Sequence, residues 1–108
     1  MRRMGMVITL QADKVTEYKA LHSAVWPSVL ATISTANITN YSIFLKEPEN
    51  LLFSYWEYTG NDIEQDLAKM AADDVTQKWW ALCKPCQQPL TGQEEQWWST
   101  MEEVFYHA

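Results

Sequence analysis

The segment NITNYSIFLKEPENLLFSYWEY, residues 37–58, predicts two antiparallel strands joined by a turn. Alternate residues of its first run share one face of an extended chain: Thr39, Tyr41, Ile43 and Leu45. The middle, KEPEN at residues 46–50, has the proline and the polar residues that are typical of a turn. The second run, LLFSYWEY at residues 51–58, has large residues on both faces, and we expect it to pair with the first run as a hairpin.

Before the hairpin, the period of the apolar residues changes from that of a strand to that of a helix. MVITLQ, residues 6–11, alternates and predicts a first strand. A helix is then expected from an N-cap at Asp13, because its stripe has helical spacing: Val15, Tyr18, His22 and Val25. Pro27 lacks the N–H that a helix interior needs, so it predicts the first turn of a second short helix.

After the hairpin, two more helices and a strand are expected. Asn61 is expected to cap a helix with one apolar side: Ile63, Leu67 and Met70. Asp73 is expected to cap another whose inward residues are Val75, Trp79 and Leu82. Residues 87–96 read as a loop, and MEEVFYH, residues 101–107, alternates as a last strand. This order of elements predicts an α+β fold, a ferredoxin-like split βαβ with an antiparallel four-stranded sheet.

A sheet with helices on one face leaves its other face open. Both faces of residues 51–58 carry large residues, so whichever face is open would form an exposed apolar patch: one face has Leu51, Phe53 and Tyr55, and the other has Leu52, Trp56 and Tyr58. A second copy of the sheet would cover the patch, and we therefore expect a homodimer. The alternative is that the loop up to Trp98 folds over the open face of its own sheet.

Composition and charge restrict the class of protein. The chain has 108 residues, of which 47% are hydrophobic, and this size fits a single domain over residues 1–108. The formal net charge is -6 and the lysines are scattered, so no basic surface for nucleic acid is expected. The apolar run that follows Arg2 and Arg3 is too short for a signal peptide or a membrane span, and we expect a cytoplasmic protein that does not bind membranes.

Cys83 and Cys86 form CKPC, which has the spacing of a redox motif. In thioredoxin-like proteins this motif opens a helix, whereas here it follows a helical pattern and falls at a helix C-terminus, where the dipole raises the pKa of a thiol. A zinc site would have to gather four ligands from two cysteines and two distant histidines. We therefore expect two reduced, partly buried thiols and no metal.

Tyr18 and His22 lie one helical turn apart and are the strongest candidates for a functional site. A helix stripe that carries both is a poor choice for plain packing, because buried polar groups need partners. Tyr41 could reach this region from the neighbouring strand. Trp79 and Trp80 point about 100° apart on a helix, so only one can face fully into the core. Indole faces and tyrosine hydroxyls together suit a sugar.

The chain resembles the L-rhamnose mutarotase family along nearly its whole length. The resemblance is carried by EYKALHSAVWPSVLATI, NYSIFL, NLLFSYWE, QKWWALC and MEEVFYHA, in this order and spacing. It implies a dimeric α+β barrel of ferredoxin-like subunits that acts without a cofactor. It also implies site residues: His22 as the catalytic residue, and Tyr18, Tyr41, Trp79 and Trp80 as sugar-binding residues.

The implied reaction is interconversion of the α and β pyranose anomers of a 6-deoxyhexose. A histidine with a pKa near neutrality can exchange protons with the sugar, and His22 is expected to donate to the ring oxygen during opening. Leu21, Ser23 and Ala24 depart from the residues that family members often have beside the histidine. The loop with Trp97 and Trp98 is more similar to a subgroup that acts on L-fucose, so L-rhamnose and L-fucose both remain candidate substrates.

Two other functions use the same fold. Small oxygenases and haem-degrading enzymes share it, and His22 would then be a haem or metal ligand. A non-catalytic sugar-binding module would use the same pocket without turnover. A Soret band would indicate haem, and replacement of His22 separates an enzyme from a binding module.

Overall fold

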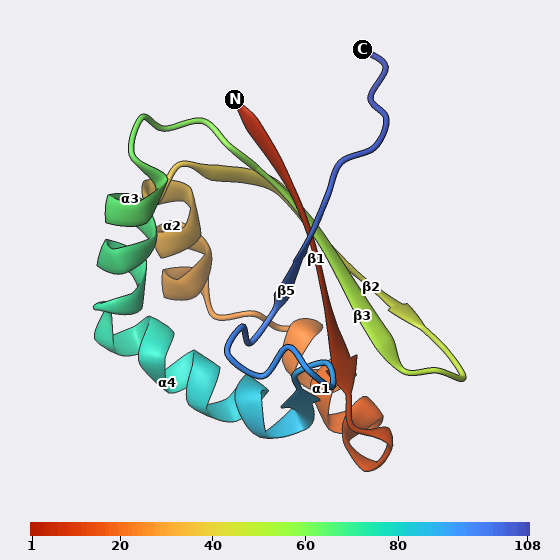
Figure 1. Cartoon of the computed structure of the whole chain (residues 1–108). Coiled ribbons are helices and arrows are strands. Elements are labelled where there is room, and N and C mark those ends of the chain that lie inside the picture. The colour runs from red at the N-terminus through yellow and green to blue at the C-terminus, as the bar shows by residue number, and fades with distance from the viewer.

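The computed structural model describes all residues, 1–108, and has the helices and strands in the expected order (Figure 1). The elements are β1 (Arg2–Leu10), the 3-10 turn η1 (Ala12–Lys14), α1 (Val15–His22), α2 (Pro27–Thr35), β2 (Ile38–Lys46), β3 (Leu51–Tyr58), α3 (Ile63–Ala71), α4 (Asp74–Cys83), the 3-10 turn η2 (Lys84–Cys86), β4 (Gln87–Gln88) and β5 (Ser99–Met101). No helix combines the length and the apolar character that a membrane span requires.

The strands form one antiparallel sheet with the order β2-β3-β1, and the fourth place is divided between β4 and β5. Both short strands pair with β1: Gln87 lies opposite Leu10, and Met101 lies opposite Gly5. The predicted hairpin of β2 and β3 is confirmed. This is the ferredoxin-like arrangement that the order of elements predicts.

The predicted last strand at residues 101–107 is wrong, because the strand is Ser99–Met101. After Met101 the chain leaves the edge of β1, and its apolar residues Val104 and Phe105 are exposed. Figure 1 shows this C-terminal segment running away from the sheet. The alternation of MEEVFYH therefore belongs to a tail beyond the sheet, which Arg3 of β1 contacts at Glu103 and Tyr106.

The helices cover one face of the sheet (Figure 1). Strand β3 alternates as expected, since Leu52, Trp56 and Tyr58 are buried on the helix side. On the other face Phe44 of β2 is 64% exposed, and it lies opposite Phe53. Trp98 packs against the core cluster on the helix side, so the alternative in which the loop covers the open face is wrong.

The starts of two helices confirm the expected signals and two differ from them. Pro27 is the first residue of α2, and the Asp73 carboxylate accepts from the Thr76 amide at 2.9 Å at the start of α4. For α3 the cap is Asp62 rather than Asn61. Asp13 lies within η1 rather than at a cap, because a tight 3-10 turn precedes α1.

The apolar sides of two helices also differ from the prediction: that of α1 is shorter, and that of α4 is rotated. α1 ends at His22, so Val25 lies in the connection to α2, which must turn before Pro27. In α4 Leu82 is 44% exposed, whereas Trp79 and Cys83 are buried. Cys83 lies four residues after Trp79, which keeps the two on one side of the helix. The inward side of α4 therefore continues into the CKPC stretch.

Candidate active site

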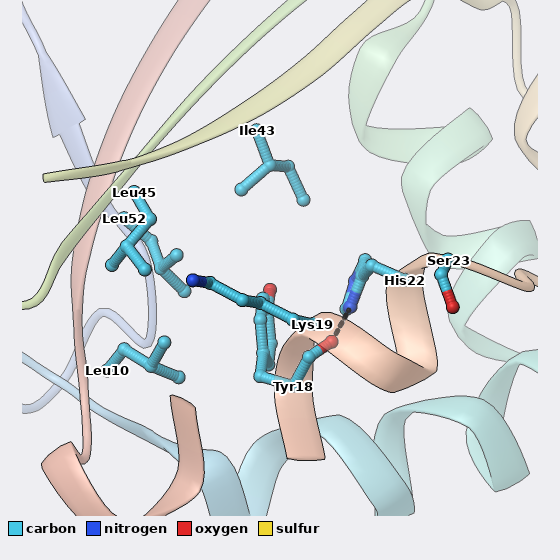
Figure 2. Close-up of a pocket in the computed structure, with 8 residues that line it drawn as sticks. All are labelled: Leu10, Tyr18, Lys19, His22, Ser23, Ile43, Leu45 and Leu52. Atoms are coloured by element: carbon cyan, nitrogen blue, oxygen red, sulfur yellow. Dashed lines mark hydrogen bonds between the residues drawn. The ribbon is translucent and has the colours of Figure 1, made fainter. Parts of the chain in front are cut away.

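A pocket of about 260 Å³ opens between α1 and the sheet (Figure 2). One side is apolar and comes from β1, β2 and β3, and the other comes from α1 and the turn after it. The lining residues are Leu10, Ile43, Leu45 and Leu52 on the first side and Tyr18, Lys19, His22 and Ser23 on the second. Pockets for drug-sized ligands typically have about 300–1,000 Å³, so this one suits a smaller molecule, of the size of a monosaccharide.

His22 is held at the end of α1 by three contacts. Its ring stacks on that of Tyr18, with centroids 4.2 Å apart, and meets the ring of Trp79 edge-on at 5.3 Å. Its Nδ1 lies 3.0 Å from the carbonyl oxygen of Tyr18. Figure 2 shows this hydrogen bond within α1, beside the pocket. The imidazole therefore has a defined orientation.

The bond to Tyr18 also decides which nitrogen of neutral His22 carries the proton. A carbonyl oxygen can only accept, so Nδ1 must be the N–H donor. Nε2 is then unprotonated and has a lone pair. Burial lowers the pKa of His22 from 6.5, an effect that the hydrogen bond to Tyr18 only partly opposes. Near neutral pH, His22 is therefore a neutral imidazole whose Nε2 can accept a proton.

Tyr18 brings a phenol to the same pocket. The residue is only 4% exposed, and its hydroxyl oxygen accepts a hydrogen bond from Nε2 of Gln87 at 3.1 Å. Burial raises the pKa of Tyr18 well above its usual 10.0. The phenol therefore keeps its proton and is suited to donate a hydrogen bond, but not to act as a base.

Tyr41 lies within a bulge in β2. Thr39 pairs with Glu57 and Ser42 with Tyr55, so three steps along β2 match two steps along β3. Thr39 therefore lies on the opposite face from Ile43 and Leu45, and the expectation of one shared face was wrong. The irregular backbone includes Asn40, which has a positive φ of 50°; asparagine tolerates this conformation better than most residues.

Tyr41 is 40% exposed and does not line the pocket. Even so, burial of its hydroxyl end and the nearby Cys83 thiol raise the pKa of Tyr41 to about 12. Tyr41 belongs to the strand whose residues Ile43 and Leu45 line the pocket. Tyr41 thus lies near the pocket without forming its wall.

Of the two neighbouring tryptophans, only Trp79 faces inward. Its buried ring lies behind His22 and meets Trp26 edge-on at 5.2 Å, so it supports the imidazole from outside the pocket. Trp80 is partly buried and points elsewhere, with the Lys84 ammonium 5.5 Å from its ring centroid. The structure therefore brings together Tyr18, His22 and Trp79, and it leaves Trp80 away from the pocket.

Sequence reasoning did not identify Lys19, Ser23 or Gln87 as site residues. Lys19 lines the pocket, and its ammonium lies 3.5 Å from the Glu47 carboxylate. Its position directly after Tyr18 in the sequence is the signal that could have identified it as a site residue. Gln87 approaches Tyr18 across 69 positions of the chain, and no local pattern predicts such a contact.

Comparison with known proteins gives one consistent result. A sequence family described as L-rhamnose mutarotase matches residues 3–107. The L-rhamnose mutarotase of Oceanobacillus iheyensis is 39% identical over 85 residues, which are 79% of this chain and 79% of that one. The L-rhamnose mutarotase of Mannheimia succiniciproducens is 33% identical over 106 residues, or 98% of both chains.

Solved structures are similar in fold over the full chain. The crystal structure of an L-rhamnose mutarotase from Formosa agariphila has a TM-score of 0.78 at 23% identity and covers 100% of both chains. A tetracenomycin F2 cyclase from Streptomyces glaucescens has a TM-score of 0.65 at 16% identity, over 100% of this chain and 97% of that one. At these identities the similarity concerns the fold alone, and it agrees with the α+β, ferredoxin-like architecture.

Proposed function

Because this chain belongs to the L-rhamnose mutarotase family of aldose mutarotases, we propose that it interconverts the α and β pyranose anomers of L-rhamnose. The observation that carries the proposal is the neutral His22 beside a pocket of monosaccharide size, with Nδ1 bound to Tyr18 and Nε2 free to accept a proton. Mutarotation needs one proton removed from the sugar and one returned to it, and it needs no redox step.

In this mechanism His22 carries out both proton transfers. Nε2 takes the proton of the anomeric hydroxyl while the anomeric carbon forms a carbonyl with that oxygen and its bond to the ring oxygen breaks. The protonated imidazole then gives the proton to the ring oxygen. Rotation of the free aldehyde, followed by the reverse steps, closes the ring on the other face. Proton transfer of this kind typically contributes about 10² to 10⁴-fold to the rate.

The apolar side of the pocket fits the methyl group that distinguishes a 6-deoxyhexose. Ile43, Leu45 and Leu52 supply this side, and a hydroxymethyl group there would lose hydrogen bonds to water. The polar residues of α1 lie opposite and would face the ring hydroxyls. L-Fucose has the same methyl group, so the pocket wall supports it as a second substrate of the same reaction.

Polarimetry of freshly dissolved sugar tests this proposal. We expect the protein to speed the relaxation of L-rhamnose above the spontaneous rate. L-Mannose, which differs from L-rhamnose only by a hydroxyl on C6, should have a kcat/KM lower by about tenfold to a hundredfold. No acceleration of either L-rhamnose or L-fucose at high protein concentration would refute the proposed function.

We also propose that the protein acts as a homodimer that buries the open face of the sheet. Phe44 and Met101 on this face are 64% and 39% exposed, and the tail carries Phe105 at 80%. The start of the tail is held by Arg3, whose guanidinium contacts the Glu103 carboxylate at 2.7 Å. An apolar face exposed in this way is typical of a protein interface. Sedimentation of the wild type should give a dimer and Phe44→Asp should shift it towards monomer, whereas a monomeric wild type would refute the proposal.

A further inference from the structure

A chain of hydrogen bonds runs from the loop before β5 to the pocket. The indole Nε1 of Trp97 donates to Oε1 of Gln87 at 2.7 Å. Nε2 of Gln87 in turn donates to the hydroxyl oxygen of Tyr18 at 3.1 Å. Gln87 is buried, and Tyr18 lines the pocket. These contacts join two residues outside the pocket to one of its polar walls.

The direction of each bond follows from the chemistry of the donors. An indole N–H can only donate, so the Gln87 atom that faces Trp97 must be the amide oxygen. The amide nitrogen of Gln87 is then turned to Tyr18, where it can only donate. The Tyr18 oxygen must therefore accept, and the Tyr18 proton must be directed elsewhere. Through these two hydrogen bonds, the Trp97 N–H thus makes the Tyr18 oxygen an acceptor from Gln87 and leaves the Tyr18 proton free for another partner.

No group of the protein accepts the Tyr18 proton, because the hydroxyl takes part only in the bond from Gln87. Figure 2 shows the Tyr18 ring extending from α1 towards the sheet, with its hydroxyl at the far end. A buried O–H without an acceptor is costly, and an acceptor on a ligand would remove that cost. A hydroxyl or ring oxygen of a sugar is such an acceptor.

We propose that Gln87 and Trp97 are positioning residues that hold the Tyr18 hydroxyl as a hydrogen-bond donor to the bound sugar. This inference rests on the proposed function and extends it to residues outside the pocket. Gln87 is well placed for this task because its backbone is fixed in β4, opposite Leu10 of β1. The Gln11 side chain adds a bond at 3.4 Å to the Gln87 carbonyl.

The test removes the indole N–H and keeps an aromatic ring. Trp97→Phe frees the Gln87 amide to rotate, so Tyr18 loses its fixed direction. A neutral hydrogen bond to the sugar is worth a factor of roughly three to ten, and we expect KM and the sugar Kd to rise by that factor with little change in kcat. Trp98→Phe is the matched control, since the Trp98 indole makes no such bond, and it should leave both constants unchanged.

A second comparison shows whether Trp97 acts through Tyr18. In a Tyr18→Phe background there is no hydroxyl to orient, so adding Trp97→Phe should have no further effect on the sugar Kd. Gln87→Glu is expected to weaken binding as well. The new carboxylate can only accept hydrogen bonds, so the Tyr18 hydroxyl would donate to it and not to the sugar. Circular dichroism and calorimetric titration with L-rhamnose check that each variant is folded and measure Kd.

The outcomes separate this inference from the proposed function. An active wild type with an unchanged Trp97→Phe Kd and KM would overturn the positioning role and leave the mutarotase proposal standing. An equal loss in the wild-type and Tyr18→Phe backgrounds would also overturn it. A wild type that binds L-rhamnose without turnover would refute the mutarotase proposal, while the titrations would still test the donor role. A wild type that neither binds nor converts the sugar would refute both.

Discussion

Leu52 connects the stability of the fold with the shape of the pocket, and Leu52→Ala tests both. The side chain is 2% exposed, packs in the main core cluster and also lines the pocket. Removing three carbons costs about 0.8 kcal/mol each in lost burial, or about 2.4 kcal/mol together. The space left behind adds to this cost, but one side of it opens into the pocket and can fill with water. We therefore expect the free energy of unfolding to fall by about 3 kcal/mol.

Urea unfolding followed by tryptophan fluorescence measures this change. Leu30→Ala is the matched control, because Leu30 is 51% exposed on α2 and its loss should cost less than about 0.5 kcal/mol. Protein concentration must be equal in all samples, since a dimer links stability to concentration. A loss below about 1 kcal/mol for Leu52→Ala, or one equal to that of Leu30→Ala, would refute the packing described for β3.

Four further predictions concern His22, the two cysteines and Leu45. Since the folded pKa of His22 lies below 6.5, kcat/KM should be constant near neutral pH and should fall as the pH drops through that pKa. A fall that begins well above pH 6.5 would contradict the assignment of this pKa to His22. Unfolded His22 takes up its proton first, so stability should also fall below about pH 6.5 by an amount that His22→Gln removes. Burial raises the pKa of Cys83 to about 12 and of Cys86 to about 11. Iodoacetamide at pH 8 should therefore label both thiols only after unfolding, and fast labelling of the native protein would contradict their burial. Leu45→Ser removes an apolar contact to the sugar methyl group, so it should raise KM for L-rhamnose about fourfold or more and should change KM for L-mannose less. An equal change for the two sugars would show that the methyl group lies elsewhere.

Local patterns predict the parts of this fold that depend on neighbours in sequence. The four-residue spacing of Tyr18 and His22 predicts their shared face, and in the structure the two rings stack. Alternation in residues 51–58 correctly separates two faces, of which the structure buries the one with Leu52. The angle between Trp79 and Trp80 predicts that only one is inward, and Trp79 is the buried one. In each of these cases the geometry of one helix or one strand is sufficient.

Features that depend on an extra residue or on distant contacts are not predicted. The bulge at Asn40 and Tyr41 adds one residue to β2, and strict alternation contains no sign of it apart from the asparagine at position 40. The pairing edge of β1 ends the last strand at Met101, although the alternation continues beyond it. The contact of Gln87 with Tyr18 joins residues far apart in the chain. Such features become visible only when the whole sheet is assembled.

The most direct test of the mechanism is exchange NMR of the anomeric protons of L-rhamnose with wild-type protein and with His22→Gln. Glutamine has nearly the size of histidine but cannot exchange protons at neutral pH. We predict that the wild type accelerates α/β exchange and that the variant loses at least roughly 10²-fold of this rate while it still binds the sugar. A variant that exchanges the anomers as fast as the wild type would show that His22 does not transfer the proton.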